Sequence, residues 1–173
     1  AETVLLALFR GSGATGLAGI RHGPTKPIIR LRRTDTHRLC QRLDLSVVHD
    51  ESNDDPRFRR NRIRHELLPL VENIFDRDVA MLIERAADLL RDDDVLLDEL
   101  ANAIDPTDAL MIASAPIPLA RRALRRWLTD GGYPPSAAAI ERVLAVARGE
   151  AVACEVAGGQ RVHRSLQRLL LSP

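Results

Sequence analysis

The chain has 173 residues, of which 45% are hydrophobic and 28% charged, and its formal net charge is +1. These values are ordinary for a soluble globular protein of one domain or two small ones. The small net charge excludes a global field that would draw the chain to nucleic acid. The sequence has no apolar run of bilayer length and no signal-peptide pattern, so a cytoplasmic protein is the expectation.

Residues 1–10 have the apolar face of a helix, and because no methionine or leader precedes them we expect the chain to start within a domain. A glycine-rich loop follows, with Gly11, Gly13 and Gly16. Glycine allows left-handed backbone and the close approach of a ligand, so a phosphate-binding loop is one interpretation. The glycines follow a helix and not a strand, however, which favours the other interpretation, a helix C-cap followed by a turn.

The next segment has the pattern of an α/β unit. Residues 27–31 and 46–48 are predicted to be short strands. A helix between them is predicted to run to Leu43, with Thr34 or Asp35 as its N-cap. Strand, helix and strand in this order indicate the tail of a Rossmann-like α/β domain.

The stretch from Asp50 to Leu70 combines an acidic turn, a cluster of arginines and an apolar helix start. The arginines are Arg57, Arg59, Arg60, Arg62 and Arg64. If a helix begins near Phe58, they crowd the end of the helix where the macrodipole favours negative charge. A bound phosphate or nucleic acid would offset that cost, but a solvated arginine-rich face is equally compatible with charge alone. Pro69 is predicted to break or kink this helix.

A longer helix is predicted over 77–104, from apolar residues at helical spacing. Its exposed side carries Asp92, Asp93 and Asp94. Consecutive helical positions point around the cylinder and not at one ion, so we expect a solvated acidic face rather than a metal site. Residues 105–116 are predicted to form a loop.

Pro118 is predicted to open the next helix, which runs to about Thr129 and ends at Gly131-Gly132. Four arginines on this helix form a second basic face. They are Arg121, Arg122, Arg125 and Arg126. They are a second candidate for contact with a phosphate backbone, and the competing interpretation is that their stems cover an apolar stripe.

The C-terminal segment changes from a helical to an alternating pattern. A helix is predicted over 137–148, followed by alternating apolar residues at 152–156 and a hairpin turn at Gly158-Gly159. Residues 162–171 are expected to supply one or two more strands. We therefore predict an α+β fold, mostly α, with a small C-terminal antiparallel sheet. The sequence has no HExxH motif and no Cys/His cluster, so no metal site is predicted.

Three motifs stand in order in the first part of the chain. The most specific is Asp50-x-Ser52-Asn53, followed by Arg60-Asn61-x-Ile63-Arg64 and then by Leu67-Leu68-Pro69-Leu70. The others are Glu2-Thr3-Val4-Leu5 with the later Arg10-Gly11-Ser12-Gly13, and Ile28-Ile29-Arg30 followed by Arg33. In this order and spacing they resemble the tRNA(Ile)-lysidine synthetases, members of the PP-loop ATP pyrophosphatase superfamily.

The resemblance implies a two-step ligase. ATP, assisted by Mg²⁺, would adenylate the C2 oxygen of the wobble cytidine of tRNA(Ile) with a CAU anticodon, and L-lysine would then displace AMP through its ε-amine to give lysidine. The motifs imply catalytic roles for Glu2 and Arg10 and cofactor-binding roles for Gly11 and Gly13. The predicted tRNA-binding residues are Arg57, Arg60, Asn61, Arg64, Arg121, Arg122 and Arg125. Because relatives dimerise, a homodimer is a further expectation.

The sequence departs from the family in two places. The Ser-Gly-Gly-x-Asp-Ser loop that binds ATP does not occur in it, and the tract after Arg30 is shorter than the family's Arg-Pro-Leu-Leu. We therefore expect the chain alone not to catalyse the ligation, and the alternative is a non-catalytic RNA-binding domain related to the family. The expected division is the C-terminal part of a PP-loop domain at 1–56, a basic joining helix at 57–76, and a helical tRNA-binding domain with its sheet at 77–173.

Overall fold

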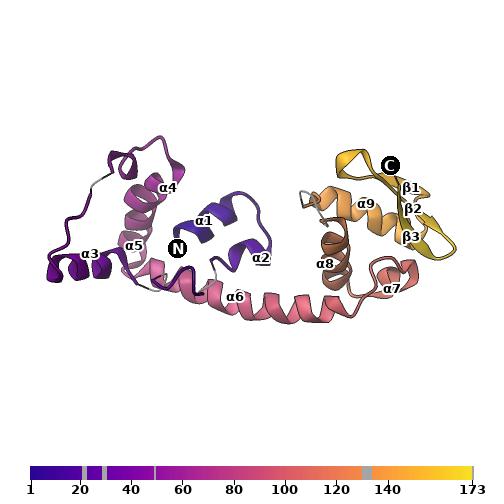
Figure 1. Ribbon diagram of the computed structural model, residues 1–173, viewed down its shortest axis with the longest axis horizontal. Coiled ribbons are helices and arrows are strands. Elements are labelled where there is room, and N and C mark those ends of the chain that lie inside the picture. Colours follow the sequence, from indigo (N-terminus) through magenta and orange to yellow (C-terminus); the bar gives the residue numbers. More distant parts are fainter. Residues whose placement is uncertain (21–22, 29–30, 49, 130–133, 173) are drawn as a thin grey trace. The chain divides into compact units, whose positions relative to one another are not determined.

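The computed structural model describes residues 1–20, 23–28, 31–48, 50–129 and 134–172 (Figure 1). Backbone contacts divide the chain into two compact units, Ala1–Asp94 and Val95–Pro173. The boundary falls inside one helix, α6 (Val79–Asn102), so this helix supplies residues to both units. In the part of the chain described, no helix is long and apolar enough to cross a membrane.

The first unit consists of helices and turns over the residues described. In chain order these are α1 (Glu2–Phe9), α2 (Ala14–Leu17), α3 (Arg33–Arg42), a 3-10 turn η1 (Glu51–Asn53), α4 (Arg59–Arg62), a π-helical turn η2 (Ile63–Leu67), α5 (Leu68–Phe75) and the first part of α6. Helix α1 contacts α2, α4 and the π-helical turn. These contacts place the start of α1 beside the arginine-rich segment, where Ile63 is buried.

The arginine-rich segment forms one helical run, from Arg59 to Phe75, with Phe58 as its N-cap. The predicted start near Phe58 is confirmed. At Pro69 the run changes its hydrogen bonding instead of breaking, since the π-helical turn Ile63–Leu67 lies directly before α5. Proline has no N–H to donate to the carbonyl four residues earlier, and its ring crowds that carbonyl. A wider turn at this point relieves the crowding.

The two strands predicted in this unit are not found in the described residues. Residues 27 and 28 lie in a turn, and 46–48 have no regular structure. Ile29 and Arg30, in the middle of the first predicted strand, lie outside the described residues, and Leu31, its last residue, lies in a bend. A strand is held by hydrogen bonds to a neighbouring strand, and Val48, 89% exposed, has none.

Helix α3 occupies the place of the predicted helix, but its N-cap differs from the prediction. The N-cap is Arg32, and not Thr34 or Asp35. Asp35 instead lies within the first turn, where its carboxylate accepts the backbone N–H of Arg32 at 3.1 Å. The Asp35 carboxylate, from within the first turn, thus accepts the backbone N–H of the N-cap residue, as in one half of a capping box.

Helix α6 confirms the predicted long helix, and its start is capped by Asp78, whose Oδ1 accepts the N–H of Met81 at 3.1 Å. Asp92 and Asp93 are exposed, as predicted. The expectation of a solvated acidic face is wrong for Asp94, which is 1% exposed. Its Oδ1 accepts the hydroxyl hydrogen of Thr15 at 2.9 Å, so this carboxylate faces α2 and not solvent.

Besides the end of α6, the second unit contains three helices packed with a sheet, over the residues described. Its elements are α7 (Ala109–Ser114), α8 (Ile117–Leu128), α9 (Ala137–Arg148), β1 (Ala153–Glu155), β2 (Arg161–Ser165) and β3 (Arg168–Ser172). The core contains side chains from the three helices and the sheet. Examples, each at most 1% exposed, are Ile112, Leu124, Leu144, Val162 and Leu169. The predicted helix over 137–148 is confirmed, whereas Gly131-Gly132 lies outside the described residues.

The loop predicted over 105–116 is wrong at residues 109–114, which form α7. Asp108 is the N-cap of this helix, and its Oδ1 accepts the N–H groups of Leu110 and Met111 at 2.9 and 3.0 Å. The cap satisfies donors that a short helix would otherwise leave to water. Ala109 and Ile112 are buried in the core, so packing stabilises a helix too short to persist alone.

The sheet has the order β1-β2-β3, with both pairs antiparallel, and so confirms the predicted small antiparallel sheet. A 3-10 turn, Ala157–Gly159, joins β1 and β2 at the predicted glycine pair. Leu166 and Gln167 join β2 and β3 with positive φ values of 47° and 65°, a turn that asparagine and glycine usually supply. Ala109 donates its N–H to the carbonyl of Gln167 at 2.9 Å, so the start of α7 holds this turn.

Candidate functional site

Glu2, at the start of α1, lies between two arginines of the helical run. Arg64 donates Nε–H to Glu2 Oε1 at 2.5 Å and Nη2–H to Oε2 at 3.1 Å. Arg60 Nε lies 3.3 Å from Glu2 Oε2, and its Nη2–H donates to Thr3 Oγ1 at 2.9 Å. The hydrogen bonds that Arg64 donates to Glu2 raise the pKa of Arg64 above its usual value. Residues of two separate motifs thus form one group, the Glu2 cluster (Glu2, Thr3, Arg60 and Arg64).

Asn61, next to this cluster in sequence, holds the acidic turn onto the helical run. Its side chain is almost fully buried, and its amide Nδ2 donates to the carbonyls of Ser52 and Asp55 at 2.8 and 2.9 Å. Within the turn, Asp50 Oδ1 accepts the N–H of Ser52 at 2.9 Å. The two halves of the most specific motif therefore fold against each other. Both amide hydrogens of Asn61 are used inside the protein in this arrangement.

Arg57 pairs with Asp55 two residues earlier. Its backbone N–H and its guanidinium donate to the Asp55 carboxylate at 2.6 to 3.1 Å. These hydrogen bonds lower the pKa of Asp55. The Arg57 side chain is nevertheless 87% exposed, so an exposed pairing of this kind leaves it accessible to a stronger anionic partner.

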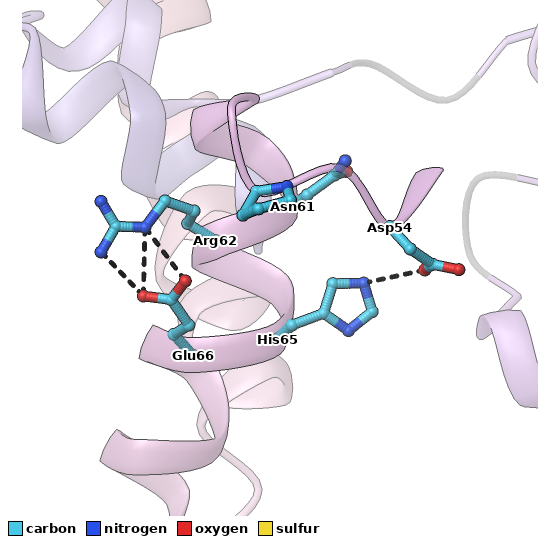
Figure 2. A pocket seen from close by; sticks show the side chains of 6 residues that line it. Asp54, Asn61, Arg62, His65 and Glu66 are labelled. Carbon is cyan, nitrogen blue, oxygen red and sulfur yellow. Dashed lines mark hydrogen bonds and ion pairs between the residues drawn. The ribbon is translucent and has the colours of Figure 1, made fainter. Parts of the chain in front are cut away.

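A small pocket of about 230 Å³ lies beside the acidic turn (Figure 2). Its lining residues are Asp54, Pro56, Asn61, Arg62, His65 and Glu66. Arg62 Nη2 lies 2.8 Å from Glu66 Oε2, and the Arg62 hydrogen bonds lower the pKa of Glu66. His65 Nε2 lies 3.5 Å from Asp54 Oδ1. The four side chains are at least half exposed and already paired, so this pocket presents no charge that calls for a ligand.

A larger pocket, of about 380 Å³, opens between α1 and the helical run. Its lining residues are Leu6, Phe9, Arg10, Arg59, Arg62, Ile63, Glu66, Leu67 and Leu70. The sequence had singled out Arg10 and Arg59, but not Leu6 or Phe9. Their spacing (i, i+3 and i+4 with Arg10) places them on one face of α1, and this helical periodicity is the signal that could have found them.

The Gly11–Gly13 loop is a helix C-cap in this structure. Gly11 has a φ of +73°, and the N–H groups of Gly11 and Ser12 donate to the carbonyls of Leu8 and Ala7 at 2.9 and 3.0 Å. These amides are therefore occupied at the negative end of the α1 dipole, and they do not fit the phosphates of ATP as the loop is folded. Within the described residues, no group of three or more His, Cys, Asp or Glu side chains could hold a metal ion.

The second basic face, on α8, is largely engaged in hydrogen bonds within the protein. Three of its arginines donate to side chains of α6 and α9. The pairs are Arg121 with Glu141 at 2.6 Å, Arg122 with Asp98 at 2.6 Å, and Arg126 with Asn102. Arg125 is exposed, and its guanidinium has no partner in the part of the chain described. Of this face, Arg125 is the cation that an RNA phosphate would reach with least competition.

Comparison with known proteins gives matches in both units. Residues 1–71 match the family model of the PP-loop domain, and residues 111–170 match that of the TilS substrate binding domain. The tRNA(Ile)-lysidine synthases of Mycolicibacterium paratuberculosis and Nocardia farcinica are 41% and 42% identical over 142 residues. That of Mycobacterium bovis is 39% identical over 146 residues. Each alignment covers 76% of this chain and 44% or 45% of the relative, so the chain spans less than half the length of the curated relatives it matches.

The class of protein that the two matches define is one with a PP-loop domain followed by a TilS substrate binding domain. Together with these relatives, the matches show that the chain is similar to the tRNA(Ile)-lysidine synthases in both of its units. The resemblance carried by the three motifs is thereby confirmed. The first match contains the Glu2 cluster and the larger pocket, and the second contains the basic face of α8.

Proposed function

We propose that the protein carrying this chain is a ligase that joins L-lysine to C2 of the wobble cytidine of tRNA(Ile) with a CAU anticodon, through an ATP-dependent adenylated intermediate, to form lysidine. The observation that supports it is the order of the two family matches, together with relatives named tRNA(Ile)-lysidine synthase. The PP-loop family supports the use of ATP, and Mg²⁺ would neutralise its phosphates. The alternative, a non-catalytic RNA-binding domain, has in its favour only that the ATP-binding loop does not occur in this sequence.

Within this function, we propose that residues 1–56 belong to the PP-loop domain, 57–76 form the joint, and 77–173 form the tRNA-binding part. The hydrogen bonds from Asn61 to the carbonyls of Ser52 and Asp55 support the attachment of this joint to the end of the first segment. A homodimer and a cytoplasmic location remain predictions.

Among the predicted catalytic residues, Arg10 is the better placed to meet a substrate. It lines the larger pocket, is exposed, and has no side-chain partner among the described residues. Glu2 instead engages Arg60 and Arg64, and its role in the proposal is to orient these two cations. Gly11 and Gly13 are proposed to act through the shape of the loop that presents Arg10 to a ligand, since the amide of Gly11 is occupied by the Leu8 carbonyl.

The test is the incorporation of labelled L-lysine into a tRNA(Ile) transcript with a CAU anticodon, by the protein that carries this chain, in the presence of ATP and Mg²⁺. The expected result is ATP-dependent labelling of the wobble nucleotide, and no labelling of a transcript whose wobble cytidine is replaced by uridine. A folded protein that incorporates no lysine would reject the proposal. Binding of the transcript without incorporation would favour the non-catalytic alternative.

A further inference from the structure

The larger pocket combines an apolar lining with charged groups at its edge. Leu6, Ile63, Leu67 and Leu70 supply aliphatic surface, and the volume of about 380 Å³ lies within the range of small-ligand sites. The π-helical turn Ile63–Leu67 contributes three of the lining residues. Such turns are uncommon and recur at functional sites.

Phe9 gives this pocket an aromatic surface that is open to ligand. The ring lines the pocket but is 67% exposed. Leaving an aromatic ring of this size in water forgoes a stabilisation of about 1.5–3 kcal/mol. A planar base stacked on the ring would recover part of it, because stacking of a base on an aromatic side chain is favourable for any base.

Arg10 and Arg59 give the pocket a positive charge that the protein does not neutralise. Both are exposed lining residues, and neither guanidinium has a hydrogen-bond or ion-pair partner among the residues described. Arg62, by contrast, is satisfied by Glu66 one turn later. Guanidinium groups bind phosphate oxygens in bidentate fashion, so the two open cations select an anion. A cationic ligand such as lysine would be repelled here.

We propose that this pocket binds one nucleotide, with its base against Phe9 and the aliphatic lining and its phosphate between Arg10 and Arg59. If the pocket had only its apolar lining, it would bind any apolar molecule. If it had only its two arginines, it would bind any anion. A nucleoside phosphate satisfies both. The inference rests on the proposed function for the source of the nucleotide, which is either a nucleotide of the RNA substrate or the adenylate of ATP.

The test is the binding of CMP, AMP and cytidine to the 173-residue chain and to its variants. The double variant Arg10→Ala with Arg59→Ala is expected to bind CMP and AMP about tenfold or more weakly and to bind cytidine with unchanged affinity. The reason is that only the nucleotides carry the phosphate. The variant Phe9→Ser is expected to bind all three ligands about tenfold more weakly. The matched control, Arg38→Ala with Arg42→Ala on α3, removes the same charge outside the pocket and should change each affinity by less than about twofold.

A measurement on the unaltered chain tests the proposal even if the variants fail to fold. Photo-crosslinking of 5-iodo-CMP, mapped by mass spectrometry, is expected to label Phe9, and labelling confined to other segments would overturn the proposal. Equal binding of CMP by the pocket variants and the control would also overturn it. So would inorganic phosphate that competes as well as CMP, since the base would then contribute nothing.

Competition by a CAU anticodon stem-loop separates the two sources. Displacement of CMP by the stem-loop, lost in the pocket variants, would identify an RNA nucleotide, and displacement by AMP or ATP alone would identify the adenylate. Lysine incorporation with unchanged nucleotide binding in the variants would reject the pocket and keep the proposed function. If the variants lose nucleotide binding but the protein incorporates no lysine, the pocket is kept and the proposed function is rejected.

Discussion

Glu2 and Arg64 lie 62 positions apart in the chain, and each is the other's main polar partner. Their side chains are 24% and 26% exposed, so the pair is partly shielded from water. At this depth an ion pair with two good hydrogen bonds is worth more than an exposed one, and its loss leaves an uncompensated charge. The cluster thus ties the start of α1 to the helical run that lines the larger pocket.

Glu2→Gln is expected to lower the free energy of unfolding by about 1–3 kcal/mol, because Arg64 then keeps its charge without a counter-charge. The double variant with Arg64→Gln should lose less than the sum of the two single variants. Urea denaturation of the four proteins measures this coupling. Strictly additive losses would show that the two side chains do not act as a pair. Arg62→Gln, which removes a cation from an exposed pair on the same helical run, is the control and should have little effect.

Among the elements of the second unit, the loop after α6 is tied to β3 by one carboxylate. Asp105 Oδ1 accepts the hydroxyl and the backbone N–H of Thr107 at 2.7 and 2.9 Å. Arg168, in β3, donates to its other oxygen at 2.8 Å. The Thr107 hydrogen bonds, helped by Arg168, lower the pKa of Asp105 to about 2. The carboxylate form of this residue is therefore favoured by folding.

The pH dependence of stability follows from this shift. The pKa of Asp105 is lower in the folded than in the unfolded chain, where it is about 3.9. Its stabilisation is therefore fully present above about pH 5 and is lost as the pH falls through about 4 toward about 2. We expect the difference in unfolding free energy between the wild type and Asp105→Asn to be constant near neutrality and to shrink over this acid range. Denaturation curves collected from pH 2 to 7 test it, and a difference independent of pH would contradict it.

Across the whole molecule, fully buried large apolar side chains are concentrated in the second unit. Those among the described residues that are at most 1% exposed, such as Ile112, Leu124 and Leu144, come from its helices and sheet. Among the described residues of the first unit, the buried apolar ones are Ala18, Ile63 and Ala87, while Phe58 and Phe75 are more than half exposed. Since buried apolar area is the main source of stability, the two units are expected to differ in their resistance to opening.

Hydrogen exchange should reveal this difference. Backbone amides of α8, α9 and β2 are expected to exchange at least about a hundredfold more slowly than those of α1, α4 and α5, because the latter open by sub-global fluctuations. Mass spectrometry of exchanged peptides measures both sets in one sample. Equal protection in the two units would contradict the expectation. Adding a nucleotide that binds the larger pocket should slow exchange in α1 and leave α9 unchanged.

Local pattern in the sequence was enough for most helices, for the C-terminal sheet and for the family. The helix over 137–148 and the start near Phe58 depend on caps, periodicity and turn residues a few positions apart, so the chain itself carries their signal. The motif spacing likewise singled out Glu2, Arg10, Asn61 and Arg64, because this spacing is a property of the sequence alone. Tertiary structure alone decided how these residues meet. It buried Asp94 against Thr15, paired Glu2 with Arg64, and left 46–48 without a strand partner. Burial, ion pairing and strand pairing join distant segments, and periodicity within one segment has no information about them.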